Sequence, residues 1–211
     1  MKAVIVAGGT PPSYELLKGE LKENTLIICA DSGGDCLYKY GILPDYLLGD
    51  FDSISEEALN YFKGKGVCID SFRRDKDYTD TQLALNKAID LGCKEIVLLG
   101  CSGNRIDHML GNLGLLKEAL SKGVKAYLKD DISHVQLTKE SIEIKGTPGE
   151  VFSLQAYCGC VEEVTIIGAK FPLNKYDLYL GDPLTISNEF LKDKVRVEFK
   201  SGYLLVIKNN I

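Results

Sequence analysis

The chain has 211 residues, of which 45% are hydrophobic and 26% charged, and its formal net charge is −5. This length suits one domain or two small ones, and the composition is that of an ordinary globular protein. The acidic balance provides no basic surface for a nucleic-acid backbone, so nucleic-acid binding is not expected. Apolar runs fall short of the ~20 residues of a membrane span, and the start, MKAVIVAGGTPP, is typical of a first strand rather than a signal peptide. We therefore expect a cytoplasmic protein.

The seven cysteines are scattered, and most lie in apolar, strand-like runs, which is typical of reduced, buried thiols. Cys158-Gly159-Cys160 leaves a metal or redox pair open as an alternative. Zinc sites usually carry two such pairs at wider spacing, so this alternative is the less favoured one.

The first part of the chain alternates strand-like and helix-like segments. Short β-rich, apolar runs lie at residues 3–7, 26–30, 46–48, 67–71, 95–100 and 126–129. Segments of helical length lie between or after them, at residues 13–21, 33–41, 55–64, 79–92 and 107–123. This alternation predicts a mainly parallel sheet with helices on both faces.

After Asp130 the helical pattern stops. Short, largely alternating runs with turn signals between them lie at residues 133–139, 140–146, 150–158, 162–169, 177–181, 184–190, 194–200 and 202–208. This pattern is typical of an antiparallel sandwich or barrel. We therefore predict an α/β N-terminal domain, residues 1–130, followed by an all-β C-terminal domain, residues 131–211.

Charged residues follow successive strands of the predicted parallel sheet. The first two groups are Asp31 and the pair Asp50 and Asp52; RRDKDYTD and GCSGNRIDH follow the next two strands and bring Asp75, Asp77, Asp80, Arg105, Asp107 and His108. In open parallel sheets, ligands bind beyond the carboxyl ends of the strands, where these groups would lie.

Each acidic group also has a structural interpretation. Asp31 would support a turn, Ser53 with Glu56 would form a helix capping box, and so would Thr79 with Gln82. Asp107 would cap the helix that follows it. Their recurrence at one sheet edge favours a joint role instead, because unpaired carboxylates at that spacing repel one another. A hard cation such as Mg²⁺, completed by substrate phosphates, resolves this repulsion.

Cations accompany the acidic groups. Arg73, Arg74 and Lys76 are interleaved with the aspartates of RRDKDYTD, and Arg105 lies in a glycine-bearing loop. A guanidinium group suits phosphate oxygens, although a solvated charged face would mix its charges as well. The Gly8-Gly9 turn lacks the Lys-Ser/Thr pair of a P-loop.

The combination of these motifs resembles the thiamine pyrophosphokinase (thiamin diphosphokinase) family. The resemblance is carried by ADSGGDCLYKYGILPDYLLGDFDSIS, DKDYTDTQLAL, GCSGNRIDHMLGN, LTISNEF and GYLLVI, in the family's order. It implies transfer of diphosphate from ATP to thiamine, with an ATP- and Mg²⁺-binding catalytic domain in residues 1–130. It also implies that residues 131–211 contribute to thiamine binding and dimerisation, so that a homodimer carries the thiamine site near its interface.

The resemblance implies a role for individual residues as well. Four aspartates would be metal ligands: Asp31, Asp50, Asp52 and Asp77. Asp50, Asp52, Asp77 and Asp80 would serve catalysis, with Asp77 or Asp80 as the acceptor of the hydroxyl proton. Asp31, Lys76, Arg105, Asp107 and His108 would bind ATP and its phosphates. Ser187 and Asn188 would contact thiamine.

Three other functions remain as alternatives. A pterin diphosphokinase would share the GDxDS core and the metal chemistry, but the β half with its Ser-Asn-Glu run favours thiamine. A phosphatase with Asp50 as nucleophile leaves the Arg-x-Asp-His segment unexplained. A non-catalytic sensor of nucleotide or thiamine is disfavoured by the full set of carboxylates.

Overall fold

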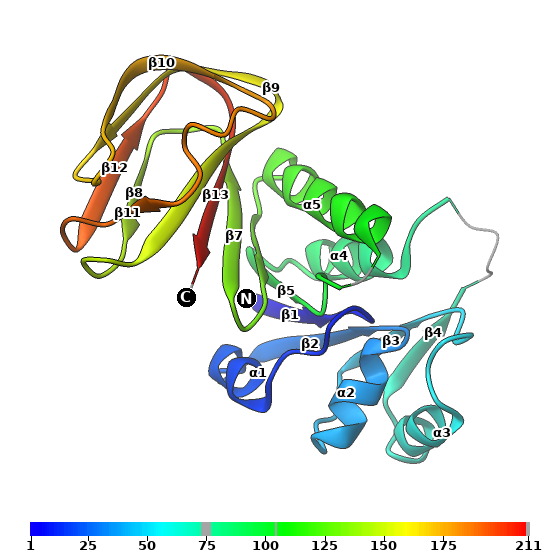
Figure 1. Ribbon diagram of the computed structural model, residues 1–211. Coiled ribbons are helices and arrows are strands. Elements are labelled where there is room, and N and C mark those ends of the chain that lie inside the picture. Colours follow the sequence, from blue (N-terminus) through cyan, green and yellow to red (C-terminus); the bar gives the residue numbers. More distant parts are fainter. Residues whose placement is uncertain (73–76, 104, 210–211) are drawn as a thin grey trace. The chain divides into compact units, whose positions relative to one another are not determined.

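A computed structural model of the chain describes residues 1–72, 77–103 and 105–209 (Figure 1). The chain divides into two compact units, Met1–Asp131 and Ile132–Ile211. Within the described ranges, every helix is too short or too polar to cross a lipid bilayer.

The first unit is built on a parallel sheet in the order β4-β3-β2-β1-β5-β6. Its strands are β1 (Lys2–Val6), β2 (Thr25–Ala30), β3 (Tyr46–Gly49), β4 (Cys68–Ser71), β5 (Glu95–Leu99) and β6 (Lys125–Lys129). The valine, isoleucine and leucine residues of the central strands β1 and β5 are at most 1% exposed, as expected for strands covered on both sides. The predicted parallel sheet is therefore confirmed.

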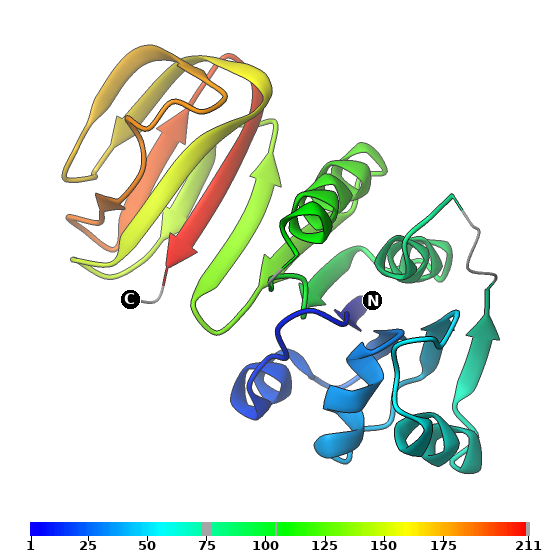
Figure 2. The same cartoon turned by 45° about the vertical axis from the view of Figure 1, so that its right-hand side comes forward.

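Five helices of the described chain connect these strands. They are α1 (Tyr14–Glu20), α2 (Gly33–Lys39), α3 (Glu56–Gly64), α4 (Asp80–Asp90) and α5 (Ile106–Ser121). Figures 1 and 2 show α1, α2 and α3 along one side of the sheet and α4 and α5 along the other. Leu17, Leu37 and Phe62 bury the first group of helices against Val4 and Val6.

All strands of this sheet run in parallel, but the side on which successive strands are added changes at β1. From β1 the chain steps outward through β2, β3 and β4, and it then returns to place β5 on the other side of β1. The loops after β1 and β5 therefore lead to helices on opposite faces of the sheet, and open parallel sheets bind ligands at the carboxyl ends of the strands beside such a switch point (Figure 1).

The second unit is antiparallel, as the sequence pattern predicts. Its strands are β7 (Ser133–Thr138), β8 (Ile142–Lys145), β9 (Val151–Ile167), β10 (Leu173–Tyr179), β11 (Asn188–Glu189), β12 (Lys194–Glu198) and β13 (Ser201–Asn209). The long strand β9 pairs with β10, β11, β12 and β13. The core of the unit includes Phe152 and Phe190, whose ring centroids lie 5.0 Å apart.

Two strand predictions in this unit are wrong in detail. Residues 150–158 and 162–169 are predicted as separate strands, yet both belong to β9. Positive φ angles at Cys158, Gly159 and Glu163 bend this strand without ending it. Residues 184–190 are predicted as a strand, but only the last three pair: Asn188 and Glu189 with β9, and Phe190 in a single bridge with Ala169. A turn occupies the residues before them.

Candidate active site

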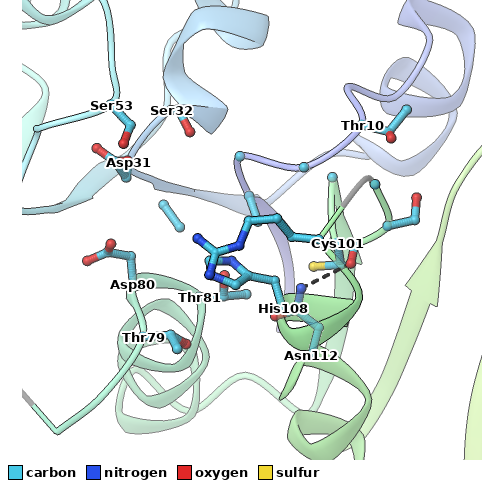
Figure 3. Close-up of a pocket in the computed structure, with 18 of the residues that line it drawn as sticks. Thr10, Asp31, Ser32, Ser53, Thr79, Asp80, Thr81, Cys101, His108 and Asn112 are labelled. Atoms are coloured by element: carbon cyan, nitrogen blue, oxygen red, sulfur yellow. Dashed lines mark hydrogen bonds between the residues drawn. The ribbon is translucent and has the colours of Figure 1, made fainter. Parts of the chain in front are cut away.

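A cavity of about 720 Å³ lies at the carboxyl ends of the parallel strands in the first unit. Segments that follow β1, β2, β3 and β5, together with the starts of α4 and α5, line it (Figure 3). Its lining residues include Gly8, Gly9, Thr10, Asp31, Ser32, Asp50, Ser53, Thr79, Asp80, Cys101, Ser102, Arg105, His108 and Asn112. Most of these side chains are polar, so the cavity suits a polar ligand.

Backbone hydrogen bonds join the loops after β1 and β5 on one side of the cavity. The Gly9 N–H donates to Gly100 O over 2.7 Å, and the Thr10 N–H donates to Ser102 O over 2.6 Å. A Cβ atom on Gly9 would lie 2.2 Å from Ser102 O, and one on Gly100, whose φ is +67°, would lie 2.2 Å from Ala7 O. Glycine at these positions lets the two backbones approach, which fixes this wall of the cavity.

Asp31, directly after β2, is the most deeply buried acidic side chain of the site. Its exposed fraction is 9%, and its Oδ1 is buried and has no hydrogen-bond partner. Burial raises the pKa of the Asp31 carboxyl, and the negative charges of Asp80, Asp50 and Asp52 raise it further. The Ser32 backbone N–H opposes this rise in the pKa. A buried oxygen with no donor, surrounded by like charges, is suited to a cation.

Asp50 and Asp52 lie in the segment between β3 and α3. The Asp52 N–H donates to Asp50 Oδ1 over 3.3 Å, and the Ser53 hydroxyl donates to Asp52 Oδ1 over 2.7 Å. Phe51 between them has a φ of +62°, a conformation that non-glycine residues rarely adopt. One carboxylate oxygen from each of Asp31, Asp50 and Asp52 lies within 4.8 Å of the others.

This cluster is made entirely of oxygen donors, which are the ligands of hard cations such as Mg²⁺. The residues present therefore fit such an ion, because it would satisfy the orphaned Asp31 oxygen and offset the repulsion among the three charges.

The capping interpretation of the Asp52 segment is wrong in its details. The cap of α3 is Ser55, whose side chain accepts from the Ala58 N–H, and not Ser53. Thr79 does cap α4, accepting from the Gln82 N–H over 3.2 Å. Asp107 lies in the first turn of α5, after the cap position at Arg105, where no side-chain capping bond forms.

Side chains of α5 and its start line the same cavity: Arg105, and His108 and Asn112, which are labelled in Figure 3. The Arg105 guanidinium forms an ion pair with Asp107 over 2.6 Å, and both side chains are about two-thirds exposed, at 68% and 66%. A hydrogen bond to Arg105 lowers the pKa of the Asp107 carboxyl. The Asn112 amide donates to Cys101 O over 3.0 Å and so holds the loop after β5 against α5.

The predicted site residues of the first unit do not all meet at the cavity. Asp31, Asp50, Asp80, Arg105 and His108 line it, and Asp52 belongs to the oxygen cluster. Asp77 and Asp107 are exposed and are not among the lining residues. Lys76, with Arg73, Arg74 and Asp75, lies outside the described residues.

In the second unit, Ser187 and Asn188 are adjacent but differ in environment. Ser187 is exposed and has a φ of +59°. Asn188 is 3% exposed. Its Oδ1 accepts from the Phe171 N–H over 3.1 Å, and its Nδ2 donates to the Phe171 carbonyl over 2.8 Å. The Asn188 side chain therefore holds the local backbone together.

Sequence reasoning missed several residues of the cavity wall, among them Thr10, Ser32, Cys101, Ser102 and Asn112. Four of them directly follow a strand or flank a glycine turn, so the rule that ligands bind at strand ends would have found them. Asn112 lies two turns into α5, and the sequence carries no signal that its amide reaches Cys101 O.

This α/β unit, with an oxygen-donor cluster facing cationic groups at its strand ends, belongs to the class of phosphate-transferring enzymes. Comparisons with known proteins specify the family. The model of the thiamin pyrophosphokinase catalytic domain matches residues 17–128, and that of the thiamin pyrophosphokinase vitamin B1 binding domain matches residues 138–204. The chain belongs to the thiamine pyrophosphokinase family.

Individual relatives agree with this assignment. The chain is 34% identical to the thiamine pyrophosphokinase of Bacillus subtilis over 99% of both chains. The crystal structure of a Bacillus subtilis thiamine pyrophosphokinase superimposes with a TM-score of 0.90 at 31% identity, covering 100% of both chains. The thiamin pyrophosphokinase of Candida albicans, at 16% identity, shares the fold with a TM-score of 0.85 over 99% of this chain and 89% of that one.

The raised pKa of Asp31 predicts a pH-dependent gain in stability on removing its charge. A carboxyl whose pKa is higher in the folded state stabilises the fold below its unfolded value of about 4, and this contribution is lost as the pH rises through the folded value. Asp31→Asn in metal-free protein should therefore raise the melting temperature at pH 7.5 by about 2–4 °C, corresponding to roughly 1 kcal/mol. Asparagine also tolerates the φ of +44° at this position.

Thermal melts of parent and variant at pH 7.5 and pH 4 measure this effect, and the gain should shrink at the lower pH. The exposed Asp193 supplies the control, since Asp193→Asn changes the net charge equally. An Asp31→Asn variant with no gain at pH 7.5 would contradict the repulsion inferred for the cluster.

Proposed function

We propose that this chain transfers the diphosphate group of ATP to the hydroxyl of thiamine, giving thiamine diphosphate and AMP. The observation that carries the proposal is the cluster of Asp31, Asp50 and Asp52 oxygens beside a polar cavity. Membership of the thiamine pyrophosphokinase family supplies the substrates. The polyphosphate of ATP would lie between this cluster and the cationic groups at the start of α5.

The cluster of Asp31, Asp50 and Asp52 would hold Mg²⁺, and Asp77, which is exposed and lies outside this cluster, would be a further ligand. When bound, Mg²⁺ supplies charge stabilisation for the transferring phosphoryl group and orients the polyphosphate. Without a cation, the three carboxylates would repel ATP, so nucleotide binding and metal binding are expected to depend on one another.

The remaining residues of the cavity bind and orient the reactants. Arg105 and His108 would contact phosphate oxygens, and the N-terminal ends of α4 and α5 add partial positive charge at the same edge of the sheet. The thiamine hydroxyl oxygen would attack the β-phosphorus, the bond from that phosphorus to the oxygen of the α-phosphate would break, and AMP would leave. Because Asp80 lines the cavity and Asp77 does not, Asp80 is the better candidate to accept the hydroxyl proton.

The second unit would contribute to thiamine binding through Ser187, whose side chain is exposed. Asn188 would act mainly by holding this turn in place, since its amide bonds the Phe171 backbone. We infer that this unit is a β-sandwich, because β9 pairs in two different sheets around a shared core. A homodimer with thiamine near its interface, and a cytoplasmic location, complete the proposal.

Product analysis tests the reaction itself. Incubation with ATP, thiamine and Mg²⁺ should yield AMP and thiamine diphosphate in equal amounts, and a hydroxymethylpterin in place of thiamine should yield no AMP. Removing Mg²⁺ by chelation should stop turnover because the acidic cluster then repels the polyphosphate. Formation of ADP and thiamine monophosphate would contradict diphosphate transfer.

Charge removal within the cluster tests the role of the carboxylates. Asp50→Asn or Asp52→Asn should lower kcat/KM by at least ~10²-fold, about 2.7 kcal/mol of transition-state stabilisation. Asparagine preserves the shape and the local hydrogen bonds, so the metal-free variants should melt no lower than the parent. Steady-state rates and thermal melts measure the two effects, with Asp193→Asn as the control for net charge. A near-parental rate for both variants would show that the pair is structural.

Substitution in the Ser187–Asn188 turn tests the contribution of the second unit. Asn188→Ala should raise the thiamine KM by roughly 5- to 150-fold, equivalent to ~1–3 kcal/mol, with little change in the KM for ATP. It should also lower the melting temperature, because a buried amide is lost. Thr185→Val is the matched control, since it removes a buried hydrogen bond to Leu154 O (2.5 Å) in the same turn. A thiamine KM for Asn188→Ala that equals that of the parent would exclude the pair from the site.

A further inference from the structure

We propose that Asp35, outside the cavity and the oxygen cluster, is a positioning residue that fixes the loop carrying Asp50 and Asp52. This inference rests on the proposed function, because it concerns how the magnesium ligands of that site are held. The loop is residues 50–55, between β3 and α3, and it is called the acidic loop below.

The acidic loop is anchored to the sheet at its first end. The Asp31 N–H donates to Leu48 O over 2.8 Å, and the Phe72 N–H donates to Gly49 O over 2.9 Å. These bonds extend the ladders of β2 and β4 against β3, so the chain enters the acidic loop in a fixed direction.

Asp35 anchors the other end. It lies in the first turn of α2 and accepts hydrogen bonds from Ser55. The Ser55 N–H is shared between Oδ1 at 3.1 Å and Oδ2 at 3.4 Å, and the Ser55 hydroxyl donates to Oδ1 over 2.5 Å. The Ser55 oxygen in turn accepts from the Ala58 N–H as the cap of α3. Asp35 therefore ties the end of the acidic loop, and the start of α3, to α2.

A side-chain contact reinforces this anchor. Ile54, the residue before Ser55, is 8% exposed and lies over Gly34, where a Cβ atom would lie 2.4 Å from the Ile54 Cδ1 atom. The neighbouring positions Gly34 and Asp35 thus hold neighbouring residues of the acidic loop, one by close packing and the other by hydrogen bonds.

The interior of the acidic loop requires such anchors. Phe51 has a φ of +62°, and conformations of this kind in non-glycine residues persist only where the surrounding structure imposes them. The oxygens of Asp50 and Asp52 also lie close to each other and to Asp31, so repulsion favours their separation. A loop fixed at both ends keeps them together before a metal binds.

Hydrogen-bonding partners behind metal ligands typically change metal affinity by about 10- to 100-fold when they are removed. Asp35 acts through Ser55, one step further from the ligands, so Asp35→Ala should weaken Mn²⁺ binding by about 10-fold, the lower end of this range. The affinity is measured by electron paramagnetic resonance of free Mn²⁺ with protein that holds no nucleotide or thiamine. Asp35→Asn keeps an acceptor oxygen for Ser55 and should bind Mn²⁺ within about 3-fold of the parent, because the hydrogen bonds to Ser55 hold the loop and the charge of a single partly solvated carboxylate contributes little.

Two further variants separate positioning from general stability. Asp45 accepts from the Ile27 N–H over 2.8 Å at the opposite ends of the strands, so Asp45→Ala removes a comparable carboxylate–backbone bond and should leave Mn²⁺ affinity unchanged. Ser55→Ala removes the hydroxyl bond to Asp35 and should weaken Mn²⁺ binding on its own, which provides a second test if Asp35→Ala folds poorly. Its effect should not add fully to that of Asp35→Ala in the double variant.

Turnover provides the second readout. For Asp35→Ala, the Mg²⁺ concentration for half-maximal rate should rise by about 10-fold while kcat at saturating Mg²⁺ stays near that of the parent. Parental Mn²⁺ affinity in both Asp35→Ala and Ser55→Ala would overturn the inference, and so would equal losses in Asp35→Asn and Asp35→Ala. Mn²⁺ binding is measured without substrates and therefore tests the role of Asp35 whatever reaction the protein catalyses. The proposed reaction is tested separately, by product analysis with the parent protein.

Discussion

Three carboxylates whose oxygens lie within 4.8 Å of one another are the constraint on which the rest of the first unit depends. In water such groups would separate, so the fold must hold them together against their repulsion. It does so by taking Asp31 from the end of β2 and the other two from the acidic loop after β3. Parallel neighbouring strands deliver both segments to the same edge of the sheet.

Contacts around the cluster offset the free-energy cost that the cluster adds to the folded state. Two residues of the cluster region, Asp31 and Phe51, have positive φ, and Asp31 is buried with an unpartnered oxygen. Buried strands, Ile54 over Gly34 and the bonds from Ser55 to Asp35 offset these costs. A bound cation would remove part of the cost, so the site is arranged to gain stability from its ligand.

The parallel sheet and the gathering of acidic groups could be predicted from sequence, because both follow from strand order. Asp31, Asp50 and Asp80 come directly after a strand or begin a helix, and the structure brings them to one cavity. Details set by tertiary contacts could not be predicted. Ser55 caps α3 in place of Ser53 because the chain turns toward Asp35, and no local pattern encodes that direction. Likewise, the environment of Asn188 depends on the Phe171 backbone, 17 residues away.

The acidic and cationic side chains of the cavity differ in burial and in the number of contacts that fix them. Asp31 is buried and the acidic loop is anchored at both ends, whereas Arg105 is 68% exposed and pairs with an equally accessible Asp107. Solvent screens an exposed ion pair of this kind, so the pair contributes little to the stability of the fold. Replacing the Asp107 carboxylate by another anion beside Arg105 therefore costs little free energy. A guanidinium group also binds phosphate oxygens in a geometry similar to that of its carboxylate pair. The proposed site therefore combines a preformed cluster of candidate metal ligands with the Arg105 guanidinium, which can exchange Asp107 for a phosphate group when a polyphosphate enters.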